Sequence, residues 1–126
     1  RRVREVNIEA NCITAMGINA LAGVLAMDDC VVEILRLDDN ELGAAGAVTI
    51  ARALVTNTTL RNLSLNSNGV GDEGGKGMVP LLKTNRRVIS LALALNNISM
   101  AISDDLEDAL LTGLSPADQT RVDFSC

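Results

Sequence analysis

The chain has 126 residues, of which 48% are hydrophobic but only 1% aromatic, and its formal net charge is −5 with a pI of about 4.6. This length fits one domain, and the acidic balance lacks the basic footprint that nucleic-acid phosphates require. No apolar stretch approaches the roughly 18 residues of a membrane span, and Arg1 and Arg2 precede no hydrophobic signal core, so the sequence predicts neither a membrane partner nor a secretory leader.

Taken in chain order, the predicted elements repeat. Four segments, 3–13, 32–42, 60–70 and 88–98, share the pattern L-x-x-L-x-L-x-x-N-x-L with Val or Ile allowed for Leu, and their asparagines recur every 28 or 29 residues. Such a period predicts a solenoid in which each layer contacts only its neighbours. The alternation around Leu35 and Leu37 marks a short strand with one buried face.

After each asparagine the apolar spacing changes to that of a helix. The inward-facing helix residues expected in the first two repeats are Ala20, Leu21, Val24, Leu25, Ala47, Ile50, Ala51 and Leu54. We therefore predict an α/β fold, a right-handed horseshoe segment with a parallel sheet on the concave side and helices on the convex side. It forms a single domain, 1–126, with repeats at approximately 3–31, 32–59, 60–87 and 88–118 and a partial terminal repeat or cap at 119–126.

Two columns of the repeat have predicted structural roles. Buried amides at the strand exits satisfy backbone groups that lose water there, so the asparagine side chains should form a ladder along the core. Glycines six residues further on allow each helix to start close to the layer beneath. The ladder consists of Asn11, Asn40, Asn68 and Asn96, and the glycine column consists of Gly17, Gly46 and Gly74.

The third repeat has an unusual helical segment, because Gly74, Gly75, Gly77 and Pro80 are poor residues for a helix interior. We expect its helix to be short, to start late or to kink, and to fray most readily. Residues 69–74 also read G-x-G-x-x-G, but no Ser or Thr follows Lys76, and Gly74 already has a place in the repeat column. We therefore predict no nucleotide site and no other cofactor.

The fourth repeat departs from the glycine column, with Ile102 at that position. Ser103, followed by Asp104 and Asp105, predicts the start of a helix with Ser103 as its N-cap. We assign these carboxylates to a solvated helix end rather than to a cation site. Alternation around Phe124 then predicts a fifth, truncated strand that closes the end of the array.

The second half of the repeat narrows the family. Residues 42–46 read L-G-A-A-G, and residues 50–60 continue as I-A-R-A-L-V-T-N-T-T-L. This pattern resembles the ribonuclease-inhibitor-like leucine-rich repeats, which include ribonuclease inhibitors, sensor arrays of NOD-like receptors, the Ran GTPase-activating protein, and tropomodulin- and CARMIL-like regulators. The resemblance implies the fold over most of the chain but does not select one of these functions.

The residue inventory argues against catalysis and metal binding. The chain contains no histidine, and Cys12, Cys30 and Cys126 lack the spacing of a zinc site or a disulfide framework. We therefore predict a protein that is not an enzyme, holds no metal and keeps its thiols reduced in the cytoplasm, with the nucleus as the alternative compartment.

A solenoid presents its variable strand residues on the concave face, where we place the functional surface. The first two strands present charged residues there, the third presents small polar groups, and the fourth presents methyl groups beside an exposed leucine. The predicted protein-binding residues are Asn7, Glu9, Arg36, Asp38, Asp39, Ser64, Asn66, Ala92, Ala94 and Leu95.

The leading hypothesis is a protein-interaction module that forms part of a larger intracellular scaffold, sensor or cytoskeletal regulator. One alternative is a GTPase-activating protein of the Ran type. Another is a purely structural array that self-associates through its uncapped N-terminal end. Because that end starts directly at Val3 with no cap, we also expect the chain to be part of a longer protein.

Overall fold

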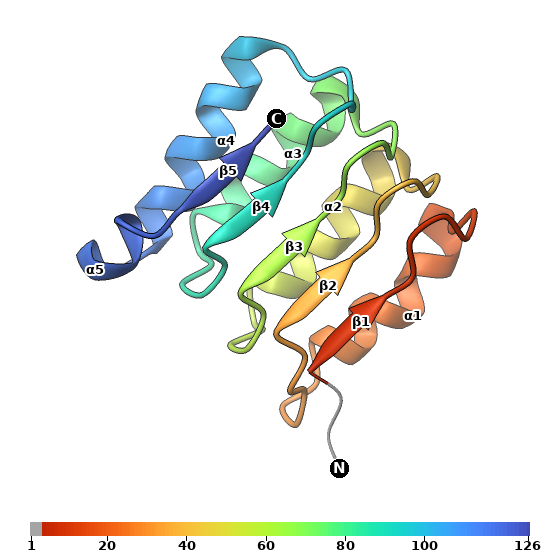
Figure 1. Ribbon diagram of the computed structural model, residues 1–126, viewed down its shortest axis with the longest axis horizontal. Helices are drawn as coiled ribbons and strands as arrows, with labels where there is room; N and C mark the ends of the chain where they lie inside the picture. The colour runs from red at the N-terminus through yellow and green to blue at the C-terminus, as the bar shows by residue number, and fades with distance from the viewer. Residues whose placement is uncertain (1–3) are drawn as a thin grey trace.

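The computed structural model describes residues 4–126 of the chain, so Val3 lies outside the described residues. Five parallel strands form one sheet in the order β1-β2-β3-β4-β5, with the helices behind it (Figure 1). The elements are β1 Glu5–Asn7, α1 Ala15–Leu25, β2 Ile34–Arg36, α2 Gly43–Leu54, β3 Asn62–Ser64, α3 Gly71–Leu82, β4 Ser90–Ala92, α4 Met100–Gly113, α5 Pro116–Gln119 and β5 Asp123–Ser125.

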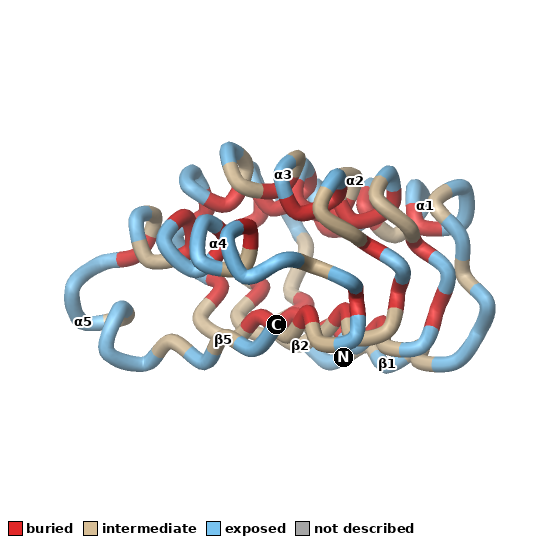
Figure 2. Tube along the Cα trace, turned by 90° about the horizontal axis from the view of Figure 1, so that it is seen from above, coloured by how far each residue is buried: buried red, intermediate tan, exposed pale blue. Residues whose placement is uncertain are grey.

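The strands and helices form two layers with the core between them (Figure 2). Leu35, Leu63 and Leu91 lie at the same register in neighbouring strands, and each is at most 1% exposed. The helices contribute the other wall of the core, including Ile50 and Leu54 of α2, which are fully buried. The predicted α/β solenoid with a parallel sheet is confirmed, and so is the predicted inward face of the second helix.

The asparagine ladder links each layer to the preceding one. Asn96 Oδ1 accepts hydrogen bonds from the backbone N–H groups of Asn68 at 2.8 Å and Val70 at 3.2 Å, while its Nδ2 donates to the Leu65 carbonyl at 2.9 Å. Asn40 makes the corresponding contacts two layers further back. Asn40, Asn68 and Asn96 are buried, as predicted.

The first position of the ladder differs from this prediction, because Asn11 is exposed. Its Nδ2 donates to the Glu9 carbonyl of its own repeat at 2.9 Å. Asn11 follows the edge strand β1, and within residues 4–126 no preceding layer reaches its amide. A ladder asparagine is therefore buried only where a layer lies on the side toward which it reaches.

The same edge effect changes the inward face of α1. Leu25 is buried and Leu21 is half-buried, but Ala20 and Val24 are exposed, so these two predicted core positions were wrong. The buried residues of α1 are Ile18, Ala22 and Leu25.

The glycine column is confirmed where a layer lies beneath it. A Cβ atom added to Gly74 would come within 2.9 Å of the Ala44 Cα of the preceding helix, and one added to Gly46 would lie 3.4 Å from the Ala15 Cα. Gly17 has no such backbone neighbour, and its closest contact would be the Ile13 side chain at 3.4 Å.

The third helix is neither short nor late, so those two parts of the prediction are wrong, while a kink at Pro80 stays a prediction. It has 12 residues, as α2 does. Its interior glycines lie where neighbouring side chains leave no room for a Cβ atom. A Cβ on Gly75 or Gly77 would approach Ile102 or Val48 to 2.6 Å, so packing offsets part of the low helix propensity. Preferential fraying of this helix remains a prediction.

The fourth helix begins earlier than predicted. Its N-cap is Ser99 rather than Ser103, and the Ser99 N–H donates to Asp72 Oδ1 at 2.6 Å. Ile102, which replaces the glycine of the other repeats, is 8% exposed, and its side chain fills the space that a Cβ atom at Gly75 would need. Loss of the glycine in one layer is thus compensated by an extra glycine in the layer before it.

Candidate functional site

The concave face is built from two rows of side chains that cross all five strands, and the predicted site residues within the strands lie in the second row. The register of the five strands aligns Asn7, Arg36, Ser64, Ala92 and Ser125 in this row. Because successive strand residues point to opposite faces, this row lies opposite the buried leucines. A shallow depression of about 130 Å³ lies over β2, β3 and β4 in this row.

The charged end of the row is partly neutralised within the chain. Arg36 Nε donates to Glu5 Oε1 at 3.0 Å, and both side chains are about half exposed. An exposed ion pair of this kind contributes at most about 1 kcal/mol to stability, so a charged group of a partner can replace either side chain of the pair at low cost. The structure thus brings together a predicted site residue, Arg36, and a neighbour outside the predicted set.

Other predicted site residues are engaged in a hydrogen-bond network across the strand exits. Asp38 Oδ1 accepts from Ser64 Oγ at 2.5 Å and from the Asn66 N–H at 2.8 Å. Asn66 Oδ1 in turn accepts from the Ala94 N–H at 2.8 Å. These side chains hold neighbouring turns together, so Asp38 and Asn66 have structural roles that the sequence pattern did not reveal.

Leu95 differs from every other predicted site residue. Its side chain is 83% exposed, and its backbone has a φ of 59°, in the left-handed region that disfavours a bulky side chain. Asp39 and Ser67 adopt the same conformation at the equivalent positions of β2 and β3 repeats, where short polar side chains suit it better. Neither burial nor backbone preference therefore favours leucine at position 95.

The convex side also has a hollow, of about 450 Å³, between α2 and α3. Short residues line it, including Ala44, Val48 and Gly77, because the helices approach closely there. Thr49, Arg52 and Glu73 also line it, so the hollow offers a hydroxyl group and both signs of charge. What distinguishes the concave side is the exposed Leu95 beside its row of polar side chains.

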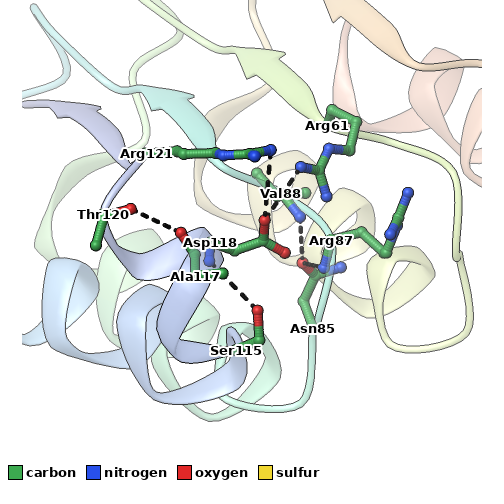
Figure 3. Close-up of polar contacts among 9 residues, drawn as sticks. All are labelled: Arg61, Asn85, Arg87, Val88, Ser115, Ala117, Asp118, Thr120 and Arg121. Carbon is green, nitrogen blue, oxygen red and sulfur yellow. Dashed lines mark hydrogen bonds and ion pairs between the residues drawn. The ribbon is translucent and has the colours of Figure 1, made fainter.

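A second polar cluster, which the sequence analysis did not find, lies at the edge of the sheet where the chain enters the strands (Figure 3). Arg61 Nη2 lies 3.5 Å from Asp118 Oδ1, and Arg121 Nη1 lies 4.0 Å from the same oxygen. Arg61 and Asp118 are 57 residues apart and occupy no common repeat column. The only feature of the sequence that could have indicated this contact is the abundance of arginine in these loops.

Within residues 4–126, no cluster of acidic or cysteine side chains has the geometry to hold a metal ion. Over the same residues, no helix combines the length and apolarity needed to cross a bilayer.

Comparison with known proteins identifies the repeat. The family described as "Leucine Rich repeat" matches residues 29–51 and 56–79. A porcine (Sus scrofa) ribonuclease inhibitor is 33% identical over 94 residues, which cover 74% of this chain and 21% of that protein. A human NACHT, LRR and PYD domains-containing protein 5 is 32% identical over 72 residues, covering 57% of this chain and 6% of that protein. The chain thus spans at most about a fifth of these relatives.

Solved structures share the fold at lower identity. The actin-binding site 2 of leiomodin-1 superimposes with a TM-score of 0.75 at 19% identity, over 96% of this chain and 68% of that one. The C-terminal domain of a Caenorhabditis elegans tropomodulin gives 0.53 at 15% identity, over 88% and 84% of the two chains. At these identities the likeness concerns the fold.

Proposed function

Because the chain belongs to the leucine-rich repeats of the ribonuclease-inhibitor-like type, we propose that it is a non-catalytic protein-binding module of a larger intracellular scaffold, sensor or cytoskeletal regulator. We place its contact surface on the concave face of the sheet and its working compartment in the cytoplasm. A solenoid of this kind has no central pocket, so an extended surface is its natural means of recognition.

The observation that carries this proposal is Leu95. An exposed leucine in a left-handed conformation costs conformational energy and makes no compensating contact within the described chain. It lies beyond Ala92 and Ala94, whose small side chains leave room for a partner beside it. Glu9 and Asp39 add negative charge toward the other end of the same edge. We therefore propose an apolar anchor at Leu95 and an electrostatic contact over β1 and β2.

The area of this face limits what one segment achieves alone. Five strands at a spacing of about 4.8 Å give a face of only a few hundred Å². A standard protein interface buries about 800 Å² on each partner. We propose that the strand-exit loops and further repeats of the parent protein supply the remainder.

The test compares capture of partners from a lysate by the original chain and by an Ala92→Arg/Leu95→Asn variant. We expect specific partners to be retained by the original chain and reduced at least about tenfold by the variant, because a bulky charge replaces the anchor region. Arg52→Glu, on the exposed side of α2, is the control and should retain them. Equal capture by all three folded proteins contradicts the placement on the concave face.

A second proposed role has its own observation, which is the uncovered first layer. Val6, Ile8 and Leu21 are half-exposed, while their counterparts Leu35, Leu37 and Ile50 are fully buried. Such a face supports stacking against another layer of the same kind, including self-association. A molar mass that rises with concentration in light scattering, and returns to that of the monomer in a Leu21→Glu variant, would support this role.

A further inference from the structure

The loops that enter β3, β4 and β5 carry an excess of positive charge, whereas the loop that enters β2, 26–33, carries three acidic residues and no basic one. Segments 55–61, 83–89 and 114–122 contain one acidic residue, Asp118, and five basic ones. These basic residues are Arg61, Lys83, Arg86, Arg87 and Arg121. The loops that leave β1 and β2, 8–14 and 37–42, carry four acidic residues and no basic one, and those that leave β3 and β4, 65–70 and 93–99, carry no charged residue. Positive charge therefore gathers beside the entry ends of β3, β4 and β5, in a protein whose net charge is −5.

Among the basic residues of this edge, Arg61 is the one with a buried side-chain atom that lacks a hydrogen-bond partner. Its side chain is only 19% exposed, and its Nη1 atom is buried without a hydrogen-bond partner. Its Nη2 reaches Asp118 at 3.5 Å, the outer limit of a hydrogen bond. A guanidinium group carries a fork of five N–H donors and costs free energy when buried with its donors unused.

Asp118 is a poor match for the two guanidinium groups that approach it in Figure 3. A single oxygen, Oδ1, faces both Arg61 and Arg121, at 3.5 Å and 4.0 Å. The residue belongs to α5, which has four residues and buries none of them. The contact therefore joins a short surface segment to two arginines through long, shared interactions.

We propose that Arg61 and Arg121 form a binding site for an oxyanion group, carboxylate or phosphate, on an acidic segment of a partner protein. Asp118 occupies this site in the free chain as a weak internal ligand. A phosphate has three acceptor oxygens and a peptide carboxylate has two that are free to orient, so either bridges two guanidinium forks better than the Asp118 oxygen does.

Arg87 extends this site along the same edge. Its guanidinium points away from Asp118 in Figure 3, and it lines a neighbouring depression of about 220 Å³ with Arg4, Thr58 and Thr59. Glu33 also lines that depression, but it is paired with Arg4. A second acidic group, one or two residues along an extended partner segment, would meet Arg87. This edge is separate from the concave row, so the inference does not depend on the proposed function.

The test is an NMR titration of the chain with inorganic phosphate and with two peptides, one rich in glutamate and one carrying phosphoserine. We expect saturable shifts of the amides of Arg61 and of residues 118–121. Stronger binding of the phosphoserine peptide would assign the oxyanion to phosphate, and stronger binding of the glutamate peptide would assign it to carboxylate.

Variants sharpen this test. Asp118→Asn removes the internal competitor and should tighten binding about threefold to tenfold, while Arg121→Gln should weaken it by about tenfold. Arg121 is 65% exposed, so its replacement should leave the fold intact even if Arg61→Gln does not. Arg52→Gln is the matched control and should leave the affinity unchanged. Unsaturable shifts, equal losses in the Arg52 and Arg121 variants, or tighter binding of an oligonucleotide than of either peptide would overturn the proposal.

Discussion

The outer helices at the two ends of the array present different surfaces. At the N-terminal end, Leu21 and Val24 of α1 are equivalent to Ile50 and Ala53 of α2. Ile50 and Ala53 are buried, whereas Leu21 is half-buried and Val24 is 46% exposed. At the C-terminal end, β5 pairs with β4. There the outer side of α4 presents charge, with Asp104, Glu107 and Asp108 exposed.

The difference shows that burial in this fold is decided by the adjacent layer and not by the layer itself. The first repeat has the same sequence pattern as the second, but several of its core residues, including Val6, Ile8 and Leu21, are only half-buried and its ladder asparagine is exposed. The outer side of α4 instead carries charged residues that are exposed to water. Within residues 4–126, the N-terminal side thus presents an apolar outer surface and the C-terminal side a charged one.

The largest expected contrast is between Ile50→Ala and Leu21→Ala, which remove side chains from the same column. Ile50 is fully buried, so its truncation should lower the free energy of unfolding by about 3 to 4 kcal/mol. Leu21 is half-buried at the open end, and its truncation should cost only about 1 kcal/mol. Urea denaturation followed by circular dichroism measures both, and equal losses would contradict the assignment of an open first layer.

The asparagine ladder provides the next contrast. Asn96→Ala leaves the buried N–H groups of Asn68 and Val70 without an acceptor, which should cost about 2 to 3 kcal/mol. Asn11→Ala removes an exposed amide and should cost less than about 0.5 kcal/mol. The same denaturation assay checks the pair, and a large loss for Asn11→Ala would show that its amide has a buried role.

The glycine column predicts that two glycine-to-alanine substitutions change stability in opposite directions. Gly74→Ala forces a methyl group to within 2.9 Å of the Ala44 Cα and should destabilise the protein by about 1 to 3 kcal/mol. Gly17→Ala meets nothing closer than 3.4 Å and should stabilise it by about 0.5 to 1 kcal/mol, since alanine restricts the unfolded chain. Thermal melting of the two variants decides this, and destabilisation by both would indicate a layer in contact with Gly17.

The smallest expected effect on stability is that of Leu95→Asn. The side chain makes no buried contact, and asparagine tolerates a positive φ better than leucine does, so stability should rise by at most about 0.5 kcal/mol. Binding of a captured partner should nevertheless weaken. A clear loss of stability without loss of binding would assign Leu95 a structural role instead.

The repeat pattern was sufficient to predict the sheet, the core leucines and the internal ladder, because these features recur at fixed spacing. It failed at Asn11, Ala20 and Val24, since exposure at an edge depends on neighbours that the local sequence does not describe. It also failed at Ser103, because the sequence does not show that Asp72 of the preceding layer binds the true helix start at Ser99.

The candidate site was less predictable than the fold. Asp38 and Asn66 have the polarity of binding residues, but their side chains accept backbone hydrogen bonds from the next strand exit. The contact between Arg61 and Asp118 joins two loops that share no repeat position. Such contacts follow from three-dimensional placement alone, and only Leu95 stands out both in the sequence and in the structure.

Hydroxyl-radical footprinting of the chain, alone and with a captured partner, tests the concave contact surface most directly. Leu95, Met16 and Met27 are 83%, 84% and 60% exposed, so each reports on the access of solvent to its own region. We expect the partner to protect Leu95 and to leave Met16 and Met27 of the first repeat unchanged. Protection of the two methionines with Leu95 still reactive would contradict this expectation and place recognition at the N-terminal end.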